Sequence, residues 1–378
     1  MSDEIGLVLS GGGARGAYQV GVLSAMAEIF SQANIQNPIK IYSGVSAGAI
    51  NAAFLAAGAD DFHKAAKGLV DLWSQLGSEK VFLSSPASIG KIGFKWMEEL
   101  SFGAFTGTTP GRSLLDTSPL NELVSTSIRF EKIKKQIESK ALKALVISAM
   151  EYNRTTTVSF VQGEPGIKMW DKARRHSETA VIGPEHIMAS SAIPLLFPPI
   201  SVDNRYFGDG CIRNNSPCAP AIYLGAKKLF VIGVRKNSTT AYEMRGMQSN
   251  RAPSVARVLN VLLNAVMLDG IELDVERLLR VNEFLSQVPE EHTRSLIYKP
   301  VDICFISPST DIGEIAISKS EHLPRLIRYL LRGLGNLDEA SEIVSYLLFD
   351  PSFCSQLIEV GFEDGMKQRD EILALVQD

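Results

Sequence analysis

The chain has 378 residues, of which 45% are hydrophobic and 21% charged, and its formal net charge is −4 at pH 7. This composition is that of a globular protein able to bury a substantial core. The length allows one large domain, or a catalytic domain with an appendage. The acidic balance argues against nucleic acid as the main partner, because such proteins usually present a basic surface. It does not exclude a neutral or lipid substrate.

Cysteine usage and the N-terminal residues bear on the cellular compartment. The four cysteines form no CxxC pair and have no histidine at zinc-ligand spacing: Cys211, Cys218, Cys304 and Cys354. We expect reduced thiols, no metal site and no cofactor. The N-terminus, MSDEIGLVLSGGG, lacks the basic head and the longer apolar stretch of a secretory signal. We therefore expect a cytoplasmic protein without a signal peptide, with export by another route left open.

In chain order, the first elements alternate between short strands and helices. An apolar run over residues 5–9 predicts a strand, and a glycine-rich turn and a helix follow it. Further predicted elements are a strand over residues 39–42, a helix over residues 47–57, and a helix over residues 60–76 capped by Asp60 or Asp61. Later apolar runs predict strands over residues 144–149, 158–161, 229–234 and 303–306. Continuously apolar strands separated by helices indicate a three-layer α/β fold, with a mostly parallel sheet covered on both faces.

The rest of the chain suggests a catalytic domain over residues 1–235 and a mainly helical C-terminal region over residues 236–378, which either packs on the same domain or stands apart. Residues 77–112 are rich in Gly, Ser and Pro and predict an irregular insertion or a lid, although its large apolar side chains also fit a packed core: Phe94, Trp96, Met97, Leu100, Phe102 and Phe105. Residues 236–253 are polar and predict a linker or an exposed loop.

An amphipathic pattern marks residues 318–334 in the C-terminal region. One predicted helix face carries Leu323, Leu326, Leu330 and Leu334, and another carries Arg325, Arg328 and Arg332. Such a helix either docks on an anionic membrane surface or packs on its own domain, and we favour the packing.

The stretch IYSGVSAGAINAAF, residues 41–54, contains Ser46 within Gly44-Val45-Ser46-Ala47-Gly48 and fits the G-x-S-x-G nucleophile elbow. In this motif a serine sits in a tight strand-to-helix turn, and glycines such as Gly44 and Gly48 let the backbone pack closely through it. The helix that follows directs its positive end toward developing negative charge. The same residues fit the G-x-x-x-G contact of membrane helices. The polar and small residues of this run make a membrane span the poorer alternative, so we expect no transmembrane helix.

The glycine-rich turn after the first strand reads Ser10-Gly11-Gly12-Gly13-Ala14-Arg15-Gly16. It contains G-x-G-x-x-G, which is typical of dinucleotide sites, but no Asp or Glu between Glu28 and Asp60 is present to hold a ribose. A Walker-type phosphate loop fails because no Gly-Lys-Ser/Thr follows. We interpret the turn as an oxyanion hole, in which backbone N–H groups approach a charged oxygen. Arg15 is either a surface cation or a tie between the loop and its surroundings, and we favour the tie.

A nucleophilic serine also needs a proton acceptor. None of the five histidines lies in a glycine-rich or turn-like setting: His63, His176, His186, His292 and His322. Asp209 is the better candidate, because it follows a short aromatic strand and stands between Gly208 and Gly210, which let another backbone segment approach the carboxylate. An ordinary Asp-Gly turn is the alternative, and this fragment by itself leaves both open.

Together, the three fragments resemble the patatin-like lipid acyl hydrolases. The family's G-G-G-x-R-G oxyanion loop is matched by residues 11–16, its G-x-S-x-G by residues 44–48, and its D-G-G or D-G-A by Asp209-Gly210. Ala189-Ser190-Ser191-Ala192-Ile193-Pro194 is similar to a further family segment near the site, so Pro194 and Gly210 are expected to support it. The resemblance covers roughly residues 5–234. Cys211 stands where the family usually has Gly or Ala, and we expect this departure to be tolerated.

The resemblance implies a serine–aspartate dyad without a catalytic histidine. Ser46 attacks an ester carbonyl while Asp209 accepts its proton, the amides of residues 11–16 hold the oxyanion, and water then hydrolyses the acyl-enzyme. An unperturbed Asp is a weak base, with a pKa of about 3.9. The site must therefore raise the pKa of Asp209 by desolvation, or rely heavily on oxyanion stabilisation.

The implied substrate is a carboxylic ester with a long acyl chain, a phospholipid or a lysophospholipid, and peripheral contact with a membrane would accompany it. Three alternatives stay open. One is an acyltransferase that passes the acyl group to an alcohol or a thiol. Another is a catalytically silent lipid-binding or interaction protein. The third is an enzyme held inactive until its C-terminal region binds a ligand or a partner. The sequence specifies neither the lipid nor the oligomeric state.

Overall fold

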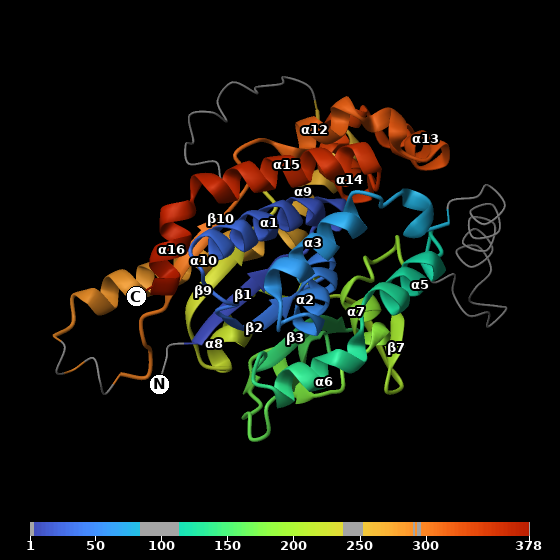
Figure 1. Ribbon diagram of the computed structural model, residues 1–378. Coiled ribbons are helices and arrows are strands. Elements are labelled where there is room, and N and C mark those ends of the chain that lie inside the picture. Colours follow the sequence, from blue (N-terminus) through green and yellow to red (C-terminus); the bar gives the residue numbers. More distant parts are fainter. Residues whose placement is uncertain (1–3, 84–112, 237–251, 290–291, 293–295, 378) are drawn as a thin grey trace.

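The structure, a computed structural model, describes residues 4–83, 113–236, 252–289, 292 and 296–377 (Figure 1). The strands are β1 (Glu4–Leu9), β2 (Ile39–Gly44), β3 (Ala144–Glu151), β4 (Thr156–Gly163), β5 (Asp171–Lys172), β6 (Arg175–Thr179), β7 (Ile200–Val202), β8 (Arg205–Asp209), β9 (Ala226–Ile232) and β10 (Asp302–Ile306).

Helices cover both faces of the sheet that these strands form. The α-helices are α1 (Gly16–Gln32), α2 (Ala47–Ala57), α3 (Phe62–Trp73), α5 (Ser118–Ser127), α6 (Phe130–Glu138), α7 (Pro184–Ser190), α8 (Ala219–Tyr223), α9 (Val255–Met267), α10 (Asp269–Ser286), α12 (Ile312–Ser318), α13 (Arg325–Leu334), α14 (Ser341–Leu347), α15 (Pro351–Lys367) and α16 (Arg369–Gln377). Short 3₁₀ helices are η1 (Gly13–Arg15), η2 (Ser78–Lys80), η3 (Gly210–Ile212), η5 (Ser320–His322) and η6 (Leu337–Ala340).

The sheet is parallel through its centre and antiparallel toward one side. Its strand order is β10-β9-β1-β2-β3-β4-β6-β5, and β8 joins β3 while pairing with β7. Neighbours from β10 to β3 are parallel, whereas β4 and β8 pair antiparallel with β3. Parallel neighbours need crossover connections, which helices such as α1 provide between β1 and β2. The predicted α/β class with a mostly parallel central sheet is confirmed.

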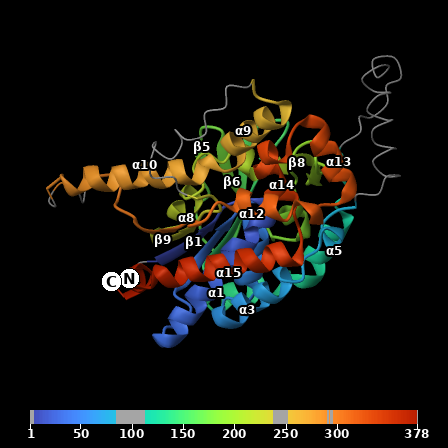
Figure 2. The ribbon, with the colours of Figure 1, turned by 90° about the horizontal axis from the view of Figure 1, so that it is seen from above.

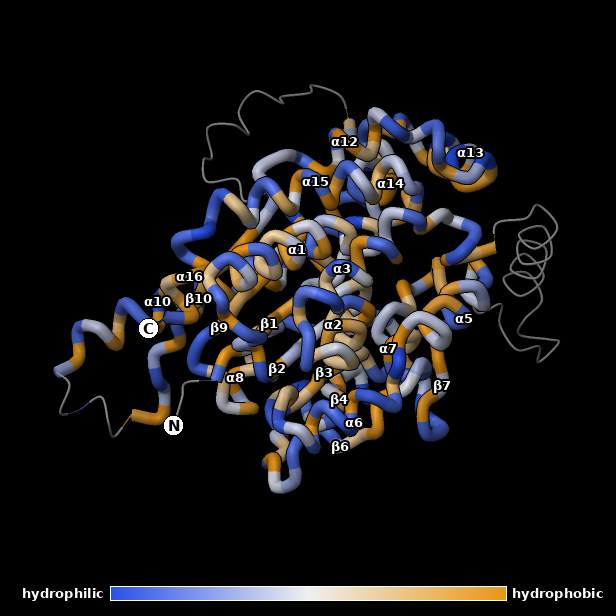
Figure 3. The backbone as a smooth tube through the Cα atoms, viewed as in Figure 1, coloured by the Kyte–Doolittle hydropathy of each residue, from blue (hydrophilic) through white to orange (hydrophobic). Residues whose placement is uncertain are grey.

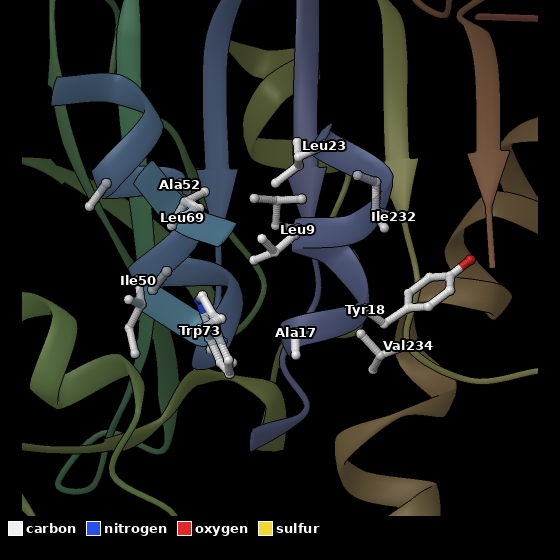
Figure 4. Packing of buried hydrophobic residues seen from close by; sticks show 14 of the residues in the cluster. Leu9, Ala17, Tyr18, Leu23, Ile50, Ala52, Leu69, Trp73, Ile232 and Val234 are labelled. Atoms are coloured by element: carbon white, nitrogen blue, oxygen red, sulfur yellow. The ribbon is translucent and has the colours of Figure 1, made fainter. Parts of the chain in front are cut away.

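Alternation along the strands produces two hydrophobic cores. Successive strand residues point to opposite faces, so Leu7 and Leu9 of β1 enter one core while Val8 enters the other. The first core lies under α1, α2 and α3, and the second under α8 and α10. Hydrophobic colours concentrate along the central strands in Figure 3. Figure 4 shows part of the first core, which includes Ile50 of α2 and Trp73 of α3.

The C-terminal part of the chain extends this architecture. Its strand β10 pairs with β9 at the edge of the sheet, and its long helix α15 packs side by side with α1 (Figures 1 and 2). A Cβ at Gly21 would lie 2.0 Å from the Ile358 carbonyl oxygen, and one at Gly361 would lie 2.1 Å from that of Tyr18. The two helix backbones are therefore in direct contact, which only glycine permits. By contrast, α10 extends away from the body in Figure 2.

Two details of the helices differ from the prediction. The helix expected over residues 60–76 is the shorter α3, capped by Asp61, whose carboxylate accepts the Lys64 N–H at 3.0 Å. In the C-terminal region, Pro324 separates η5 from α13, so Leu323 does not belong to the helix that follows. The buried residues of α13 are Ile327 and Leu331, whereas Leu330 and Leu334 of the predicted leucine face are 40% and 38% exposed.

Other expectations fall partly outside the described residues. The aromatic stretch of the predicted lid, with Phe94, Trp96, Met97, Leu100, Phe102 and Phe105, lies there, as do residues 237–251 of the predicted linker. Within the described residues, no helix combines the length and the apolar character that a membrane crossing requires.

Candidate active site

Strand register brings Ser46 and Asp209 to the same edge of β3. The other edge of β3 is occupied by β4. On the near edge, β2 pairs as far as Gly44 opposite Ile147, and β8 ends with Asp209 opposite Ala149. Because the chain turns directly after Gly44, Ser46 lies where β2 gives way to β8. Strand β1 runs parallel to β2, so the glycine-rich turn that follows β1 emerges at the same end of the sheet.

Ser46 occupies a strained turn between β2 and α2. Its φ and ψ are 55° and −125°, a combination that residues with a side chain rarely adopt. A Cβ at Gly44 would lie 2.3 Å from the Gly48 carbonyl oxygen, and one at Gly48 would lie 2.3 Å from the Leu9 carbonyl oxygen. Side chains at either position would exclude this turn. The serine itself is only 2% exposed, at the start of α2.

The Asp209 carboxylate is completely buried at the end of β8. Its backbone N–H donates to the Ala192 carbonyl at 2.8 Å, and its Oδ1 accepts the Cys211 N–H at 2.9 Å. Its Oδ2 forms no hydrogen bond of standard geometry with another described residue. Burial raises the pKa of Asp209 to about 6, against the lowering influence of the neighbouring Ser46 hydroxyl and of Cys211. The carboxylate thus stands beside Ser46 with few hydrogen-bond donors around it.

The backbone of the glycine-rich turn lies against this pair. A Cβ at Gly11 would lie 2.3 Å from Cys211 Sγ and 2.9 Å from Ser46 Cβ. Gly13 adopts a φ of +57°, which favours glycine. Within the described chain, the N–H groups of Gly12 and Gly13 donate to no acceptor. Unpaired amides beside a serine are the donors that a developing oxyanion requires.

The remaining residues of the turn start α1. Ala14 is fully buried within η1, and Gly16 is the first residue of α1. A Cβ at Gly16 would lie 2.7 Å from the Trp73 ring and 2.9 Å from Ala47 Cβ. The turn therefore fits closely against the helix that Ser46 begins.

Arg15 is a buried tie and not a surface cation. It is 1% exposed, donates to the Val234 carbonyl oxygen at 3.3 Å and forms an ion pair with Glu342 of α14. Burial lowers the pKa of the guanidinium to about 10, so it stays charged at neutral pH. A charged group this deep needs partners of opposite charge or acceptors, and the C-terminal region supplies one of them.

An apolar pocket opens beside Ser46 and Gly13. Its volume is about 30 Å³, which is room for a few water molecules at most. The lining side chains are mostly aliphatic and aromatic and come from α2, α3, α5 and the segments after α3, α7 and α14: Ala47, Ile50, Leu72, Trp73, Leu76, Val81, Leu120, Leu123, Ser191, Ile193, Phe197 and Phe349. A hydrocarbon chain matches this lining, whereas a charged group does not.

The sequence also predicts that Gly210 and Pro194 support the site. A Cβ at Gly210 would lie 2.2 Å from the Ser148 carbonyl oxygen, so the segment after Asp209 needs glycine to lie against β3. Pro194 is half-buried and does not itself line the pocket, although its neighbour Ile193 does. Among the histidines, His186 packs edge-to-face on Phe160 with ring centroids 4.6 Å apart, and its Nδ1 accepts the Gly183 N–H.

Sequence reasoning missed several polar residues that hold the site. The Ser46 N–H donates to Ser190 Oγ at 2.9 Å, and the Ser190 hydroxyl donates to the Ser148 carbonyl at 2.7 Å. Ser190 lies in the 189–194 segment that resembles the family pattern, which was a usable signal. Glu342 and Ser345, which contact Arg15, carry no such signal because they are ordinary residues of a distant helix.

The chain is similar to several known proteins. A family model described as patatin-like phospholipase matches residues 7–222. A search among curated proteins finds no match. Similar solved structures include VipD from Legionella pneumophila, with 13% identity, a TM-score of 0.37 and coverage of 98% of this chain and 67% of that one. Human GIVD cytosolic phospholipase A2 has 10% identity, a TM-score of 0.44 and coverage of 99% and 60%. The type III effector ExoU of Pseudomonas aeruginosa has 14% identity, a TM-score of 0.36 and coverage of 98% and 53%. The chain thus spans between about half and two thirds of the length of these structures.

Proposed function

This chain belongs to the patatin-like phospholipase family, and on that premise we propose that it is a lipid acyl hydrolase using Ser46 as nucleophile and Asp209 as base. One observation carries the proposal. Ser46 stands between a buried carboxylate on one side and unpaired backbone amides on the other, at the mouth of an apolar pocket. A serine in this setting has a proton acceptor, an oxyanion site and a place for an acyl chain.

Acylation follows from these neighbours. Ser46 Oγ attacks the ester carbonyl carbon while its proton moves to Asp209. The carbonyl oxygen takes the negative charge within reach of the Gly12 and Gly13 amides, which are free to donate. The intermediate then breaks the bond to the alcohol, which leaves with the proton from Asp209, and the acyl group remains as an ester on Ser46. Water attacks this ester by the same route and regenerates the serine.

The environment of Asp209 fits the role of base. General-base catalysis works best when the pKa of the base lies near the working pH. Burial brings the pKa of Asp209 to about 6, so the carboxylate is largely ionised at pH 7 and a stronger base than an exposed aspartate. The unpaired Oδ2 leaves one oxygen available for the serine proton.

The pocket supports an ester with a long acyl chain as substrate. Its wall is built from apolar residues such as Ile50, Trp73 and Leu120, which match a hydrocarbon chain chemically but offer a glycerophosphate no counter-charge. We accordingly assign the acyl chain to the pocket and the lipid headgroup to the outside. Phospholipids and lysophospholipids both fit this division.

A fluorophosphonate probe tests the nucleophile directly. An alkyl fluorophosphonate should label the wild-type protein covalently, and Ser46→Ala should not be labelled. Ser125→Ala is the matched control, because Ser125 is an exposed helical serine, and it should label like the wild type. No labelling of the wild type at any pH, or persistent labelling of Ser46→Ala, would remove Ser46 from the proposal.

The reaction itself is tested with a phospholipid that carries a labelled acyl chain. Release of the free fatty acid supports hydrolysis. Acyl transfer to an added alcohol, without free fatty acid, would reassign the protein as an acyltransferase. Labelling by the probe without turnover of any lipid ester would contradict the proposed substrate class.

A further inference from the structure

Arg15 of the glycine-rich turn is held mainly by one C-terminal helix, α14. Its Nε donates to Ser345 Oγ at 2.7 Å, and its Nη2 donates to the Glu342 carboxylate. The guanidinium also lies over the Tyr346 ring, 5.6 Å from the ring centroid. These three residues are more than 300 positions away from Arg15 in the sequence. They lie outside the region that the family model matches.

We propose that Glu342 and Ser345 are positioning residues, which fix the oxyanion loop through Arg15 and so make α14 part of the candidate active site. The inference rests on the proposed function, because it assigns a catalytic purpose to the loop that these residues hold. Neither residue needs to contact the substrate.

The backbone of α14 also packs directly against the glycine-rich loop. A Cβ at Gly13 would lie 2.4 Å from the Tyr346 carbonyl oxygen. Gly13 is the loop residue that lines the pocket together with Ser46. A displacement of α14 would therefore move both the guanidinium and the peptide that carries an unpaired amide.

The polar contacts within α14 set Glu342 and Ser345 in place. The Ser345 hydroxyl donates to the Glu342 carbonyl at 2.6 Å while it accepts from Arg15. The Glu342 N–H donates to Asn260 Oδ1 of α9 at 2.9 Å. Asn260 is buried. The loop is thus connected through Arg15 and α14 to α9.

The ion pair between Arg15 and Glu342 contributes to this connection. Arg15 is a buried cation, and the neighbouring charged groups are Asp311 and Arg235 besides the paired Glu342. Separate acceptors for Nε and Nη2, Ser345 Oγ and the Glu342 carboxylate, restrain the guanidinium in both position and orientation. Glu342→Gln would keep the shape of the side chain but remove the charge that holds the guanidinium.

The test measures labelling by an alkyl fluorophosphonate in the full chain as a function of pH. We expect Glu342→Gln and Ser345→Ala to label roughly 10- to 100-fold more slowly on the high-pH plateau, because small misplacements of catalytic groups have effects of this size. The pH midpoint should stay that of the wild type, since Asp209 is not altered. Glu4→Gln is the matched control, because Glu4 pairs with Lys143 in a partly buried ion pair at the other end of β1, and its rate should stay within about twofold of wild type.

The outcomes separate the two proposals. If the wild type does not label, the proposed function fails. If the wild type labels and both folded variants label at its rate, the positioning role is wrong although the nucleophile stands. Should Glu342→Gln fail to fold by circular dichroism, Ser345→Ala decides, since it removes a single acceptor. Loss of fold in both variants, or a shifted pH midpoint, would assign α14 a structural role alone.

Discussion

The two flanks of Ser46 are equally buried but differ in how their charged groups are partnered. Arg15, on the side of the proposed oxyanion loop, is 1% exposed and has Glu342, Ser345 and the Val234 carbonyl as partners. Asp209, the proposed base, is 0% exposed, and its Oδ2 has no well-formed hydrogen bond in the described structure. The guanidinium of Arg15 thus has three hydrogen-bond acceptors, whereas the carboxylate of Asp209 has one oxygen that accepts the Cys211 N–H and one without a well-formed hydrogen bond in the described structure.

This difference matches what each flank is proposed to do. An oxyanion is stabilised by donors that are already fixed before charge appears, so the loop that offers them has to be held firmly. A base must instead attract a proton, and partners that stabilise its anion would lower its pKa. Desolvation outweighs the hydrogen bonds to Asp209 and raises its pKa, whereas the buried Arg15 has a pKa of about 10 and stays charged beside its acceptors.

The largest expected effect comes from removing the base. Asp209→Asn should reduce the rate of fluorophosphonate labelling at pH 8 by roughly 10²- to 10⁴-fold, which is the usual contribution of a general base. Asp203→Asn, at an exposed acid in the turn between β7 and β8, is the control and should label normally. Retained labelling of Asp209→Asn would move the base to another residue.

Next in size is a change in the loop. Gly13→Ala should slow labelling by roughly 10²-fold, because its Cβ meets the Tyr346 carbonyl and its φ is +57°. Gly166 also has a positive φ, of +89°, but no atom lies within 4 Å of a Cβ there. Gly166→Ala therefore carries similar backbone strain without the contact, and its labelling rate should equal that of wild type. Equal loss in both variants would mean that strain alone, and not the contact with α14, matters.

A third prediction concerns the free energy of unfolding at pH 8, which substitutions at Asp209 and Glu342 should change in opposite directions. The pKa of Asp209 rises from 3.8 to about 6 on folding, so the folded state holds a proton that the unfolded chain releases between these values. Its contribution to stability therefore falls as pH rises from about 4 to 6, by about 3 kcal/mol in all. Asp209→Asn should accordingly raise the free energy of unfolding at pH 8 but not at pH 4.

On the other flank, Glu342→Gln should lower the free energy of unfolding by roughly 3 kcal/mol at pH 8, because it leaves a buried cation without its counter-charge. Urea unfolding at pH 4 and pH 8 measures the free energy of unfolding of Asp209→Asn and of Glu342→Gln against wild type. Changes of the same sign at pH 8 would contradict the contrast between the flanks. The labelling rate of wild type should rise through about pH 6 as Asp209 ionises.

The smallest effect is expected at Cys211, which lies between the flanks. Burial raises the pKa of this thiol well above its usual value, so it is uncharged at neutral pH and poorly nucleophilic. Because the thiol is one of the groups that lower the pKa of Asp209, Cys211→Ala should shift the pH midpoint of labelling slightly upward and leave the plateau within about threefold. A downward shift would show that the thiol does not donate to the carboxylate.

Much of this arrangement follows from local sequence patterns. The strands at the centre of the sheet are continuously apolar, and β1, β2, β3, β4, β9 and β10 lie where such runs predict them. The turns around Ser46 and Gly13 depend on glycines that the sequence displays directly. Short polar strands such as β5 and β6 were not predicted, since Asp171–Lys172 and Arg175–Thr179 have no apolar alternation.

Contacts between distant segments could not be predicted. Nothing near Glu342 indicates that its carboxylate reaches Arg15, because ion pairs leave no periodic pattern in the sequence. The same holds for Ser190, whose hydroxyl joins the Ser46 N–H to β3. The face on which α13 packs was mistaken for a related reason, since leucines on both sides of a helix leave the choice to tertiary packing.

Because the pocket beside Ser46 is so small, the proposed substrate would have to enlarge it on binding. A space of about 30 Å³ is too small for a long acyl chain, so binding of the proposed substrate would require the lining side chains of α2, α3 and α5 to move apart. Each methylene that is buried contributes about 0.8 kcal/mol to binding. The free energy needed to open the pocket is spent mostly when the first methylenes enter. Tail length would then govern which lipids react, without any recognition of the headgroup.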